Sequence, residues 1–378
     1  MIYLDHNATT PLSEQALDAM LPYLRESFGN PSAIYAAGRV AQEGMAQARE
    51  QVARLLGCAA RHVVFTSGGT ESTNAAIRSA LELSGKQHLV VSSVEHSATR
   101  NLAETLERQG IGVTYVQVDS DGQLDLDQLQ RSIRADTALV SLMWANNETG
   151  VLFPVEEIGA LCRERGVLFH VDAVQAVGKL PVALEALPID YASVSAHKIY
   201  GPKGAGALYV NRRSGFVPLL VGGGQESGRR GGTENVPALV GFGAAAAQVS
   251  ADTGPVRELR DEFEAELEQA FPDAVIHGVN SARLSNTSNF RLPGVEAESL
   301  LLQLDNAGIC ASAGSACTTG SLEPSHVLLA MGVKRADATS AVRFSFGREN
   351  TRGEVQQVME ELRQSVARLK DGLPPLTS

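Results

Sequence analysis

One lysine, Lys198, lies at the point where a strand-like run of residues gives way to glycines. The run over 190–194 leads into Ser195-Ala196-His197-Lys198, and Gly201 and Gly204 follow. A strand end holds side chains still, and an amine in a dry, dipole-lined pocket there has a lowered pKa. A partly neutral lysine forms a Schiff base with an aldehyde or ketone, and pyridoxal phosphate is the obvious aldehyde. The alternative for Lys198 taken alone is a solvated surface lysine, since lysines are mostly exposed.

A glycine-rich turn is the second feature with chemical potential. The short strand expected over 62–66 ends in Ser67-Gly68-Gly69-Thr70-Glu71-Ser72, and a helix is expected to begin at once. Glycines let backbone N–H groups approach an anion, and a helix N-terminus adds the positive end of its dipole. The turn therefore predicts a phosphate cradle, although an ordinary tight turn capped by Thr70 would explain the same residues.

Polar groups follow directly on three further apolar runs of the chain: Glu95-His96, Asn146-Asn147-Glu148-Thr149-Gly150, and Asp172. The carboxyl ends of parallel strands share one edge of a sheet, where ligands bind. Each group also has a structural alternative: His96 could cap the next helix, Asn147 could serve a turn, and Asp172 could be an N-cap. Their convergence with Lys198 favours a common site.

The four cysteines are Cys58, Cys162, Cys310 and Cys317, with no CxxC pair and no metal-ligand spacing. The sequence therefore indicates neither a disulfide framework nor a structural zinc. Cys310 is most simply a buried small hydrophobe, and Cys58 and Cys162 are incidental. Cys317 lies among Gly, Ala, Ser and Thr residues with no large apolar neighbour, which is typical of an exposed, reactive thiol.

Strands and helices alternate along the first part of the chain. Strands are expected over 62–66, 89–93, 113–118, 138–144, 167–171, 190–194 and 205–210. Helices are expected over 13–26, 33–56, 98–108, 126–134 and 236–249. This alternation predicts a parallel sheet with helices on both faces. After a boundary at 250–255, helices over 255–270, 297–305 and 354–369 and strands near Val275 and Asn289 suggest a smaller α+β domain.

Composition restricts the classes of function. With 378 residues the chain is too long for one comfortable core, and its 44% hydrophobic and 20% charged residues are those of an ordinary globular protein. The formal net charge of −11 argues against nucleic acid or an acidic membrane as the main partner. No signal peptide or bilayer-spanning stretch is present in the sequence, so we expect a cytoplasmic protein.

Taken together, these motifs resemble the cysteine desulfurases of the NifS/IscS type, within the class V aminotransferase-like, fold-type I pyridoxal-phosphate enzymes. The matching motifs span almost the whole chain in the family's order: Tyr3-Leu4-Asp5-His6-Asn7-Ala8-Thr9-Thr10-Pro11, Ser67-Gly68-Gly69-Thr70-Glu71-Ser72, Glu95-His96, Asn146-Asn147-Glu148-Thr149-Gly150, His170-Val171-Asp172-Ala173-Val174-Gln175, Ser195-Ala196-His197-Lys198, Gly314-Ser315-Ala316-Cys317 and Arg343-Phe344-Ser345-Phe346-Gly347-Arg348.

The resemblance implies an α/β fold in which a mostly parallel seven-stranded sheet lies between helices, beside a smaller α+β domain. The large cofactor-binding domain would cover residues 13–252. The small domain would combine residues 1–12 with 253–378 and would carry the loop of Cys317.

The resemblance also implies roles for the residues around the cofactor. Lys198 would hold pyridoxal phosphate and later move the α-proton, Asp172 would pair with the pyridinium nitrogen, His96 would stack on the ring, and Gln175 would hydrogen-bond the ring hydroxyl. A separate set would hold the phosphate: Gly69 and Thr70 of the cradle, Ser195, His197, and Thr233 from the second subunit of a homodimer.

For the substrate, the resemblance implies that Asn147 and Arg343 bind the carboxylate of L-cysteine. The Cys317 thiolate would then take the sulfur as a persulfide, release L-alanine, and pass the sulfur to acceptor proteins for iron–sulfur cluster assembly or tRNA thiolation. The catalytic residues would be Lys198, Cys317 and His96. Two alternatives remain: a selenocysteine lyase or other β-eliminase or aminotransferase of this cofactor class, and an inactive scaffold that docks sulfur-acceptor proteins.

Overall fold

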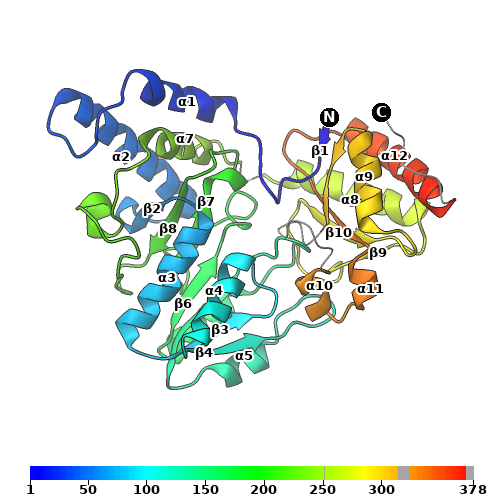
Figure 1. Ribbon diagram of the computed structural model, residues 1–378, viewed down its shortest axis with the longest axis horizontal. Coiled ribbons are helices and arrows are strands. Elements are labelled where there is room, and N and C mark those ends of the chain that lie inside the picture. The colour runs from blue at the N-terminus through cyan, green and yellow to red at the C-terminus, as the bar shows by residue number, and fades with distance from the viewer. Residues whose placement is uncertain (251, 314–323, 372–378) are drawn as a thin grey trace.

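A seven-stranded sheet runs through the larger of two bodies in the computed structural model, which describes residues 1–250, 252–313 and 324–371 (Figure 1). Within these residues the strand order is β2 (Val63–Thr66), β8 (Gly206–Val210), β7 (Tyr191–Ser195), β6 (Leu168–Asp172), β5 (Thr137–Met143), β3 (His88–Ser92) and β4 (Gly112–Val116). All neighbours are parallel except β8, which is antiparallel to both β2 and β7. The predicted mostly parallel α/β fold is confirmed.

The strands are apolar because helices cover both faces of the sheet. All seven residues of β5 are buried, as is typical of a parallel sheet enclosed on both sides. Successive side chains alternate between faces, so Val90 and Val91 belong to different hydrophobic clusters. Five helices provide the cover: α2 (Ala36–Leu56), α6 (Val155–Glu164) and α7 (Val236–Ala246) on the face of Val90, and α3 (Gly69–Ser84) and α4 (Ser97–Arg108) on the face of Val91.

Two more helices complete this body. Helix α1 (Glu14–Arg25) lies beside α7, and the short α5 (Leu126–Ser132) lies next to β4 (Figure 1). The start of α1 follows the sequence expectation, because the side chain of Ser13 accepts a hydrogen bond from the backbone N–H of Ala16.

The smaller body is built on a four-stranded antiparallel sheet in the order β12 (Ser312–Ala313), β13 (Ala341–Ser345), β10 (Thr287–Arg291) and β9 (Val275–Ile276). Three helices pack on it: α8 (Gly254–Ala270), α9 (Ala297–Asn306) and α12 (Arg352–Lys370). Four buried aromatic rings, those of Phe263, Phe290, Phe344 and Phe346, form the middle of its core. The α+β character expected for this part of the chain is confirmed.

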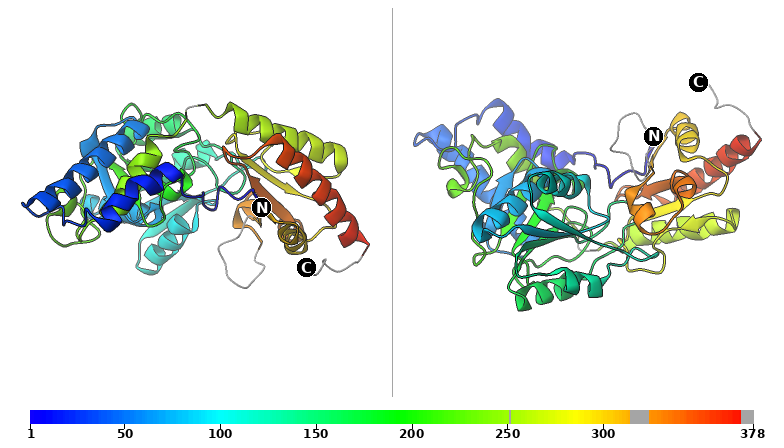
Figure 2. Two further views of the ribbon diagram at one scale, coloured as in Figure 1. Left: turned by 90° about the horizontal axis from the view of Figure 1, so that it is seen from above. Right: turned by 60° about the horizontal axis from the view of Figure 1, so that its bottom comes forward.

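The two ends of the chain contribute to the smaller body. Strand β1 (Ile2–Tyr3) pairs in parallel with β11 (Ile309–Cys310), and the chain then crosses to the larger body before α1 (Figures 1 and 2). We call residues 5–10 the N-terminal strap. The pairing of β1 is compatible with the predicted grouping of residues 1–12 with 253–378, whose boundaries stay a prediction.

Two short helices, α10 (His326–Ala330) and α11 (Arg335–Ala338), precede β13. Although α10 follows the small-domain strands in sequence, its Val327 and Leu328 are buried in the same hydrophobic cluster as β5 and β6 of the larger body. Helix α10 therefore packs against the larger body.

A few expected boundaries differ from the observed ones. The helix expected from residue 33 begins at Ala36, because the N–H of Ala33 bonds Asn30 in a turn and Tyr35 is extended. The helix expected to reach residue 134 ends at Ser132, where Ile133 takes an extended conformation. The helix expected to reach residue 249 ends at Ala246.

Candidate functional site

The carboxyl ends of the parallel strands open onto a cavity of about 280 Å³ between the two bodies. Ten of the predicted site residues line it: Gly69, Thr70, His96, Asn147, Asp172, Gln175, Ser195, His197, Lys198 and Arg343. Thr233 is exposed and does not line this cavity, and Cys317 lies outside the described residues. A mostly parallel sheet explains the convergence, because the polar groups that follow β3, β5, β6 and β7 meet at one edge.

Lys198 stands on a short 3₁₀ turn (Ala196–Lys198) directly after β7. Its Nζ donates to two carbonyl oxygens of the N-terminal strap, those of Asn7 and Ala8, each at 2.6 Å. The turn is tight: the next tyrosine, Tyr200, has a φ of 65°, and its N–H bonds the hydroxyl of Thr10 at 2.7 Å. The amine is thus held at the cavity by a segment that lies almost 200 residues away in sequence.

Asp172 ends β6 with its carboxylate buried at the bottom of the cavity. Its Oδ1 accepts the N–H of Val174 at 3.0 Å, which closes a turn and does not cap a helix. Burial raises the pKa of Asp172, while His96 and Lys198 lower it. A buried carboxylate with a remaining acceptor oxygen can stabilise a cationic N–H group in the cavity.

His96 both caps a helix and lines the cavity. Its Nδ1 accepts the N–H of Ala98 at 3.1 Å and so caps α4, and its ring is part of the cavity wall. Burial lowers the pKa of His96, and Lys198 lowers it further, whereas Asp172 raises it. A neutral ring fixed by its cap presents a flat face to a bound aromatic group.

The turn before α3 has the properties of an anion site. Its N-cap is Gly68, so the sequence alternative in which Thr70 caps the helix is wrong. Two close approaches require glycine here: a Cβ on Gly69 would come within 2.7 Å of the Val174 side chain, and one on Gly206 within 2.5 Å of the Gly68 Cα. The first amides of a helix have no partner within it and favour an anion.

Side chains complete the surroundings of this turn. Ser195 and His197 line the cavity beside it, and His197 Nδ1 lies 3.1 Å from the hydroxyl of Thr9. Burial, and then Lys198, lower the pKa of His197 to about 4, so the ring is neutral at pH 7. An ion pair between Arg230 and Glu71, 3.0 Å long, ties the loop that contains Thr233 to the first turn of α3.

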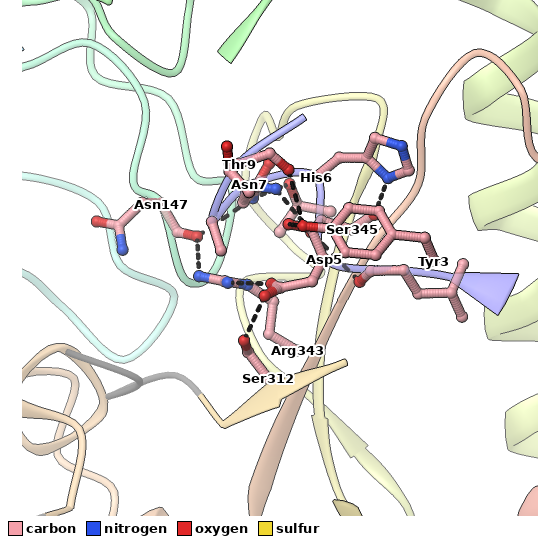
Figure 3. A network of polar contacts seen from close by, with 12 residues as sticks. Tyr3, Asp5, His6, Asn7, Thr9, Asn147, Ser312, Arg343 and Ser345 are labelled. Carbon is pink, nitrogen blue, oxygen red and sulfur yellow. Dashed lines mark hydrogen bonds and ion pairs between the residues drawn. The ribbon is translucent and has the colours of Figure 1, made fainter. Parts of the chain in front are cut away.

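Arg343, on β13, enters the cavity from the smaller body (Figure 3). Its Nη2 lies 2.6 Å from Asp5 Oδ1, and its Nη1 donates to the backbone oxygen of Asn147 at 2.9 Å. The buried Nε of Arg343 has no hydrogen-bond partner among the described residues. A guanidinium with this geometry can bind a substrate carboxylate.

Three residues at the site had no role assigned from the sequence. Asp5 and Asn7 are in the strap, and Lys179 lies four residues after Gln175. The Lys179 Nζ donates to Asn7 Oδ1 at 2.8 Å and to Gln175 Oε1 at 2.5 Å. Burial lowers the pKa of Lys179 well below its usual value, and Lys198 and Arg343 lower it further. Two sequence signals could have indicated these residues: the motif over 3–11, which contains Asp5 and Asn7, and the four-residue spacing of Lys179 from Gln175.

Two buried carboxyl groups lie behind the wall of the cavity. Burial raises the pKa of Glu95 to about 8 and that of Glu148 to about 7. Glu95 Oε1 accepts from the Ser92 hydroxyl at 2.6 Å and from the Met143 N–H at 3.1 Å. Glu95 comes three residues after the end of β3 and Glu148 five residues after the end of β5, and each is next in sequence to a cavity residue, His96 or Asn147.

Two features are absent from the described ranges 1–250, 252–313 and 324–371. No helix there is long and apolar enough to cross a membrane. No group of three or more His, Cys, Asp or Glu side chains there could hold a metal ion.

Comparisons with known proteins agree with the geometry. The family model described as "Aminotransferase class-V" matches residues 2–358. A cysteine desulfurase of Nostoc sp. is 49% identical over 375 residues, which cover 98% of this chain and 94% of that protein. Cysteine desulfurase IscS of Dictyoglomus turgidum is 42% identical, with coverage of 98% and 95%.

Solved structures give the same result. A NifS-like protein superposes with a TM-score of 0.90 at 36% identity, covering 97% of this chain and 99% of that one. A structure described as SspA in complex with cysteine has a TM-score of 0.83 at 37% identity, with coverage of 92% and 99%. The chain therefore belongs to the class-V aminotransferase family and, within it, to the cysteine desulfurases.

Proposed function

We propose that the protein is a pyridoxal-phosphate-dependent cysteine desulfurase, which converts L-cysteine to L-alanine and takes the sulfur onto Cys317 as a persulfide. The observation that carries the proposal is the cavity in which Lys198, Asp172, His96 and Arg343 meet. It combines an amine, a buried carboxylate, a neutral aromatic wall and a cation suited to a carboxylate.

The donor set fits the cofactor of this family. The amides of Gly69 and Thr70 at the start of α3, with Ser195 and His197, would hold the phosphate. Asp172 would pair with the ring nitrogen, Gln175 would bond the ring hydroxyl, and His96 would cover the ring. When bound through Lys198, the cofactor supplies an electron sink for negative charge at the substrate Cα.

The chain's own groups would do the remaining work. Arg343 and Asn147 bind the substrate carboxylate, which orients the amino group and the sulfur. The Lys198 amine would take the proton from the substrate Cα, and its strap contacts to Asn7 and Ala8 keep it at the cavity. Asp172 would supply a buried negative charge that stabilises the positive charge of the cofactor's ring nitrogen.

The sulfur transfer balances without another oxidant or reductant. The Cβ–S bond of cysteine breaks and an S–S bond to Cys317 forms. The electron pair of the broken Cβ–S bond ends in a new Cβ–H bond of alanine. The proton of that bond is, in the overall balance, the one that the Cys317 thiol gives up. The substrate carbon is thereby reduced, and the Cys317 sulfur is oxidised to a persulfide.

Chain reach supports the choice of Cys317. Four residue steps separate it from Ala313, which ends β12, and an extended chain covers at most about 14 Å in four steps. The neighbour of Ala313, Ser312, donates to Asp5 Oδ2 at 2.7 Å, and Asp5 is paired with Arg343. The tether of Cys317 thus begins next to the carboxylate-binding residue.

We further propose a cytoplasmic homodimer in which Thr233 completes the phosphate site of the partner subunit. The sulfur would pass to acceptor proteins for iron–sulfur cluster assembly or tRNA thiolation. Thr233 is exposed and does not line the cavity of its own chain, which supports this part of the proposal.

Product analysis tests the proposed activity. A single exposure of the cofactor-loaded protein to cysteine without reductant should release alanine and add one sulfur atom to the peptide containing Cys317. A Cys317→Ser variant should bind cofactor and respond spectrally to cysteine, yet form no persulfide. Full sulfur release by this variant would indicate an eliminase or lyase, and no alanine from the wild type would indicate a scaffold.

A further inference from the structure

The hydroxyl of Ser325 links the smaller body to the strand end that carries Asn147. Its Oγ donates to Glu148 Oε2 at 2.5 Å and accepts the N–H of Leu328 at 3.1 Å. It is therefore both the N-cap of α10 and the hydrogen-bond partner of a buried carboxylate. Glu148 follows Asn147 directly, so the link reaches the substrate-binding wall.

A second link joins the next residue to the strand end that carries His96. His326 Nε2 lies 2.9 Å from the backbone oxygen of Glu95, and a carbonyl acceptor means that Nε2 bears the proton. Burial lowers the pKa of His326, and the Glu95 carbonyl raises it. Consecutive residues thus contact both strand ends that flank the cavity.

Apolar packing fixes the same helix. Val327, Leu328 and Met331 are buried in the hydrophobic cluster of the larger body, and in Figure 1 α10 lies on the side of the smaller body that faces the larger one. The start of α10 is therefore held by two hydrogen bonds and by a buried apolar side.

Ser312, which precedes residues 314–323 in the chain, also contacts a residue of the site. Ser312 of β12 bonds Asp5 and pairs in register with Arg343. Residues 314–323, which include Cys317, thus connect two points that are each attached to the cavity wall: Ser312 at the Arg343 side and Ser325 with His326 at the Asn147 and His96 side.

We propose that Ser325 and His326 are positioning residues for sulfur transfer, which act by fixing the downstream attachment of the Cys317 segment to the walls that hold substrate and cofactor. The inference rests on the proposed function. Neither side chain is among the residues that line the cavity, and both would act through the chain that leads to Cys317.

Partial reactions separate this role from a structural one. In Ser325→Ala, the affinity for pyridoxal phosphate, the cysteine-induced spectral change and the KM for cysteine should stay within about twofold of wild type. The single-turnover rate of persulfide formation on Cys317 should fall about tenfold, which corresponds to about 1.4 kcal/mol. Ser325→Thr, which keeps the hydroxyl, should restore most of the rate.

Matched variants provide the controls. Ser299→Ala removes another serine hydroxyl that bonds a glutamate, Glu296, on the exposed surface of the smaller body, and it should change nothing. His326→Ala should reproduce the defect of Ser325→Ala. His326→Gln, whose amide can donate to the Glu95 carbonyl, should be close to wild type.

The outcomes distinguish the possibilities. Unchanged persulfide formation in both Ser325→Ala and His326→Ala would overturn the inference, as would an equal loss of cofactor affinity and transfer rate, which indicates a purely structural role. A wild-type protein that forms neither alanine nor persulfide would refute the proposed function itself. If Ser325→Ala does not fold, the two His326 variants decide in the same assays.

Discussion

The carboxylate of Asp5 holds the guanidinium of Arg343 at a distance of 2.6 Å, across 338 residues of sequence. Both side chains are largely buried, and the hydroxyl of Ser312 donates to the second oxygen of Asp5 (Figure 3). The pair fixes the direction of the arginine that we propose as the carboxylate ligand.

Removing the charge of Asp5 should loosen this arginine. Asp5→Asn should raise the KM for cysteine about tenfold, because a bidentate or charge-assisted contact contributes about 1.5–3 kcal/mol, while cofactor binding should remain unchanged. Steady-state kinetics and cofactor titration check both parts. Arg343→Lys should show a comparable rise in KM, and an unaltered KM in both variants would contradict the assignment.

Lys198 should be the only lysine attached to the cofactor. Reduction of the loaded, yellow protein with borohydride should fix the cofactor to the peptide containing Lys198, because its amine stands at the cavity. Peptide mapping by mass spectrometry gives the result. The nearby Lys179 is the internal control. Label on Lys179 instead would show that it, and not Lys198, binds the cofactor.

Lys179 should support cofactor binding indirectly. Lys179→Met removes the amine that donates to Gln175 and Asn7, and we expect about a tenfold weaker affinity of the cofactor-free protein for pyridoxal phosphate. Lys179→Arg should restore part of the affinity, and Lys334→Met, at an exposed position of the smaller body, should have no effect. Equal affinities in all four proteins would exclude this role.

Glu95 should make the cofactor-free protein less stable as the pH rises. Burial raises its pKa from 4.5 to about 8, so the folded state retains a proton that the unfolded chain has already lost. Its contribution is complete below about pH 4.5 and is lost as the pH rises through about 8. Glu95→Gln should therefore gain about 1–3 kcal/mol relative to wild type between pH 5 and 8.

Urea unfolding at several pH values measures this difference. Glu360→Gln, on the exposed side of α12, serves as the control and should run parallel to wild type. A Glu95→Gln curve that is also parallel to wild type would show that Glu95 is ionised in the folded protein.

Thr233 should act across the subunit interface. Neither Lys198→Ala nor Thr233→Ala alone should turn over normally, but a mixed dimer contains one site with both native residues. Mixing the two variants should therefore recover activity, up to one site in each mixed dimer. Proven subunit exchange without recovery would show that Thr233 acts within its own subunit or not at the site.

The parts of the site that were predicted from sequence are those that local patterns encode. Asp172 directly follows the apolar run over 167–171, Lys198 comes shortly after the strand-like run over 190–194, and the carboxyl ends of parallel strands must meet at one edge. Gly68 and Gly69 similarly mark a helix start that favours anions. The order of strands and polar residues along the chain was therefore enough to predict that these groups share one site.

Contacts between distant segments carry no such local signal. Asn7 and Lys179 are 172 residues apart, and the bond between them depends on the course of the strap between the two bodies. The attachment of Ser325 to Glu148, across 177 residues, was hidden for the same reason. His96 shows a further limit, because cap and cavity wall were considered as alternatives although one side chain does both.

The path of the N-terminal strap has a consequence for folding during synthesis on the ribosome. Residues 2 and 3 pair with residues 309 and 310, so strand β1 can form its pairing only after β11 has been synthesised. The larger body has nearly all of its sheet long before that, and domains generally fold as units during synthesis. The carbonyl groups of Asn7 and Ala8 that hold the Lys198 amine should therefore come into place only after residues 309 and 310 have been synthesised, well after the strands of the larger body.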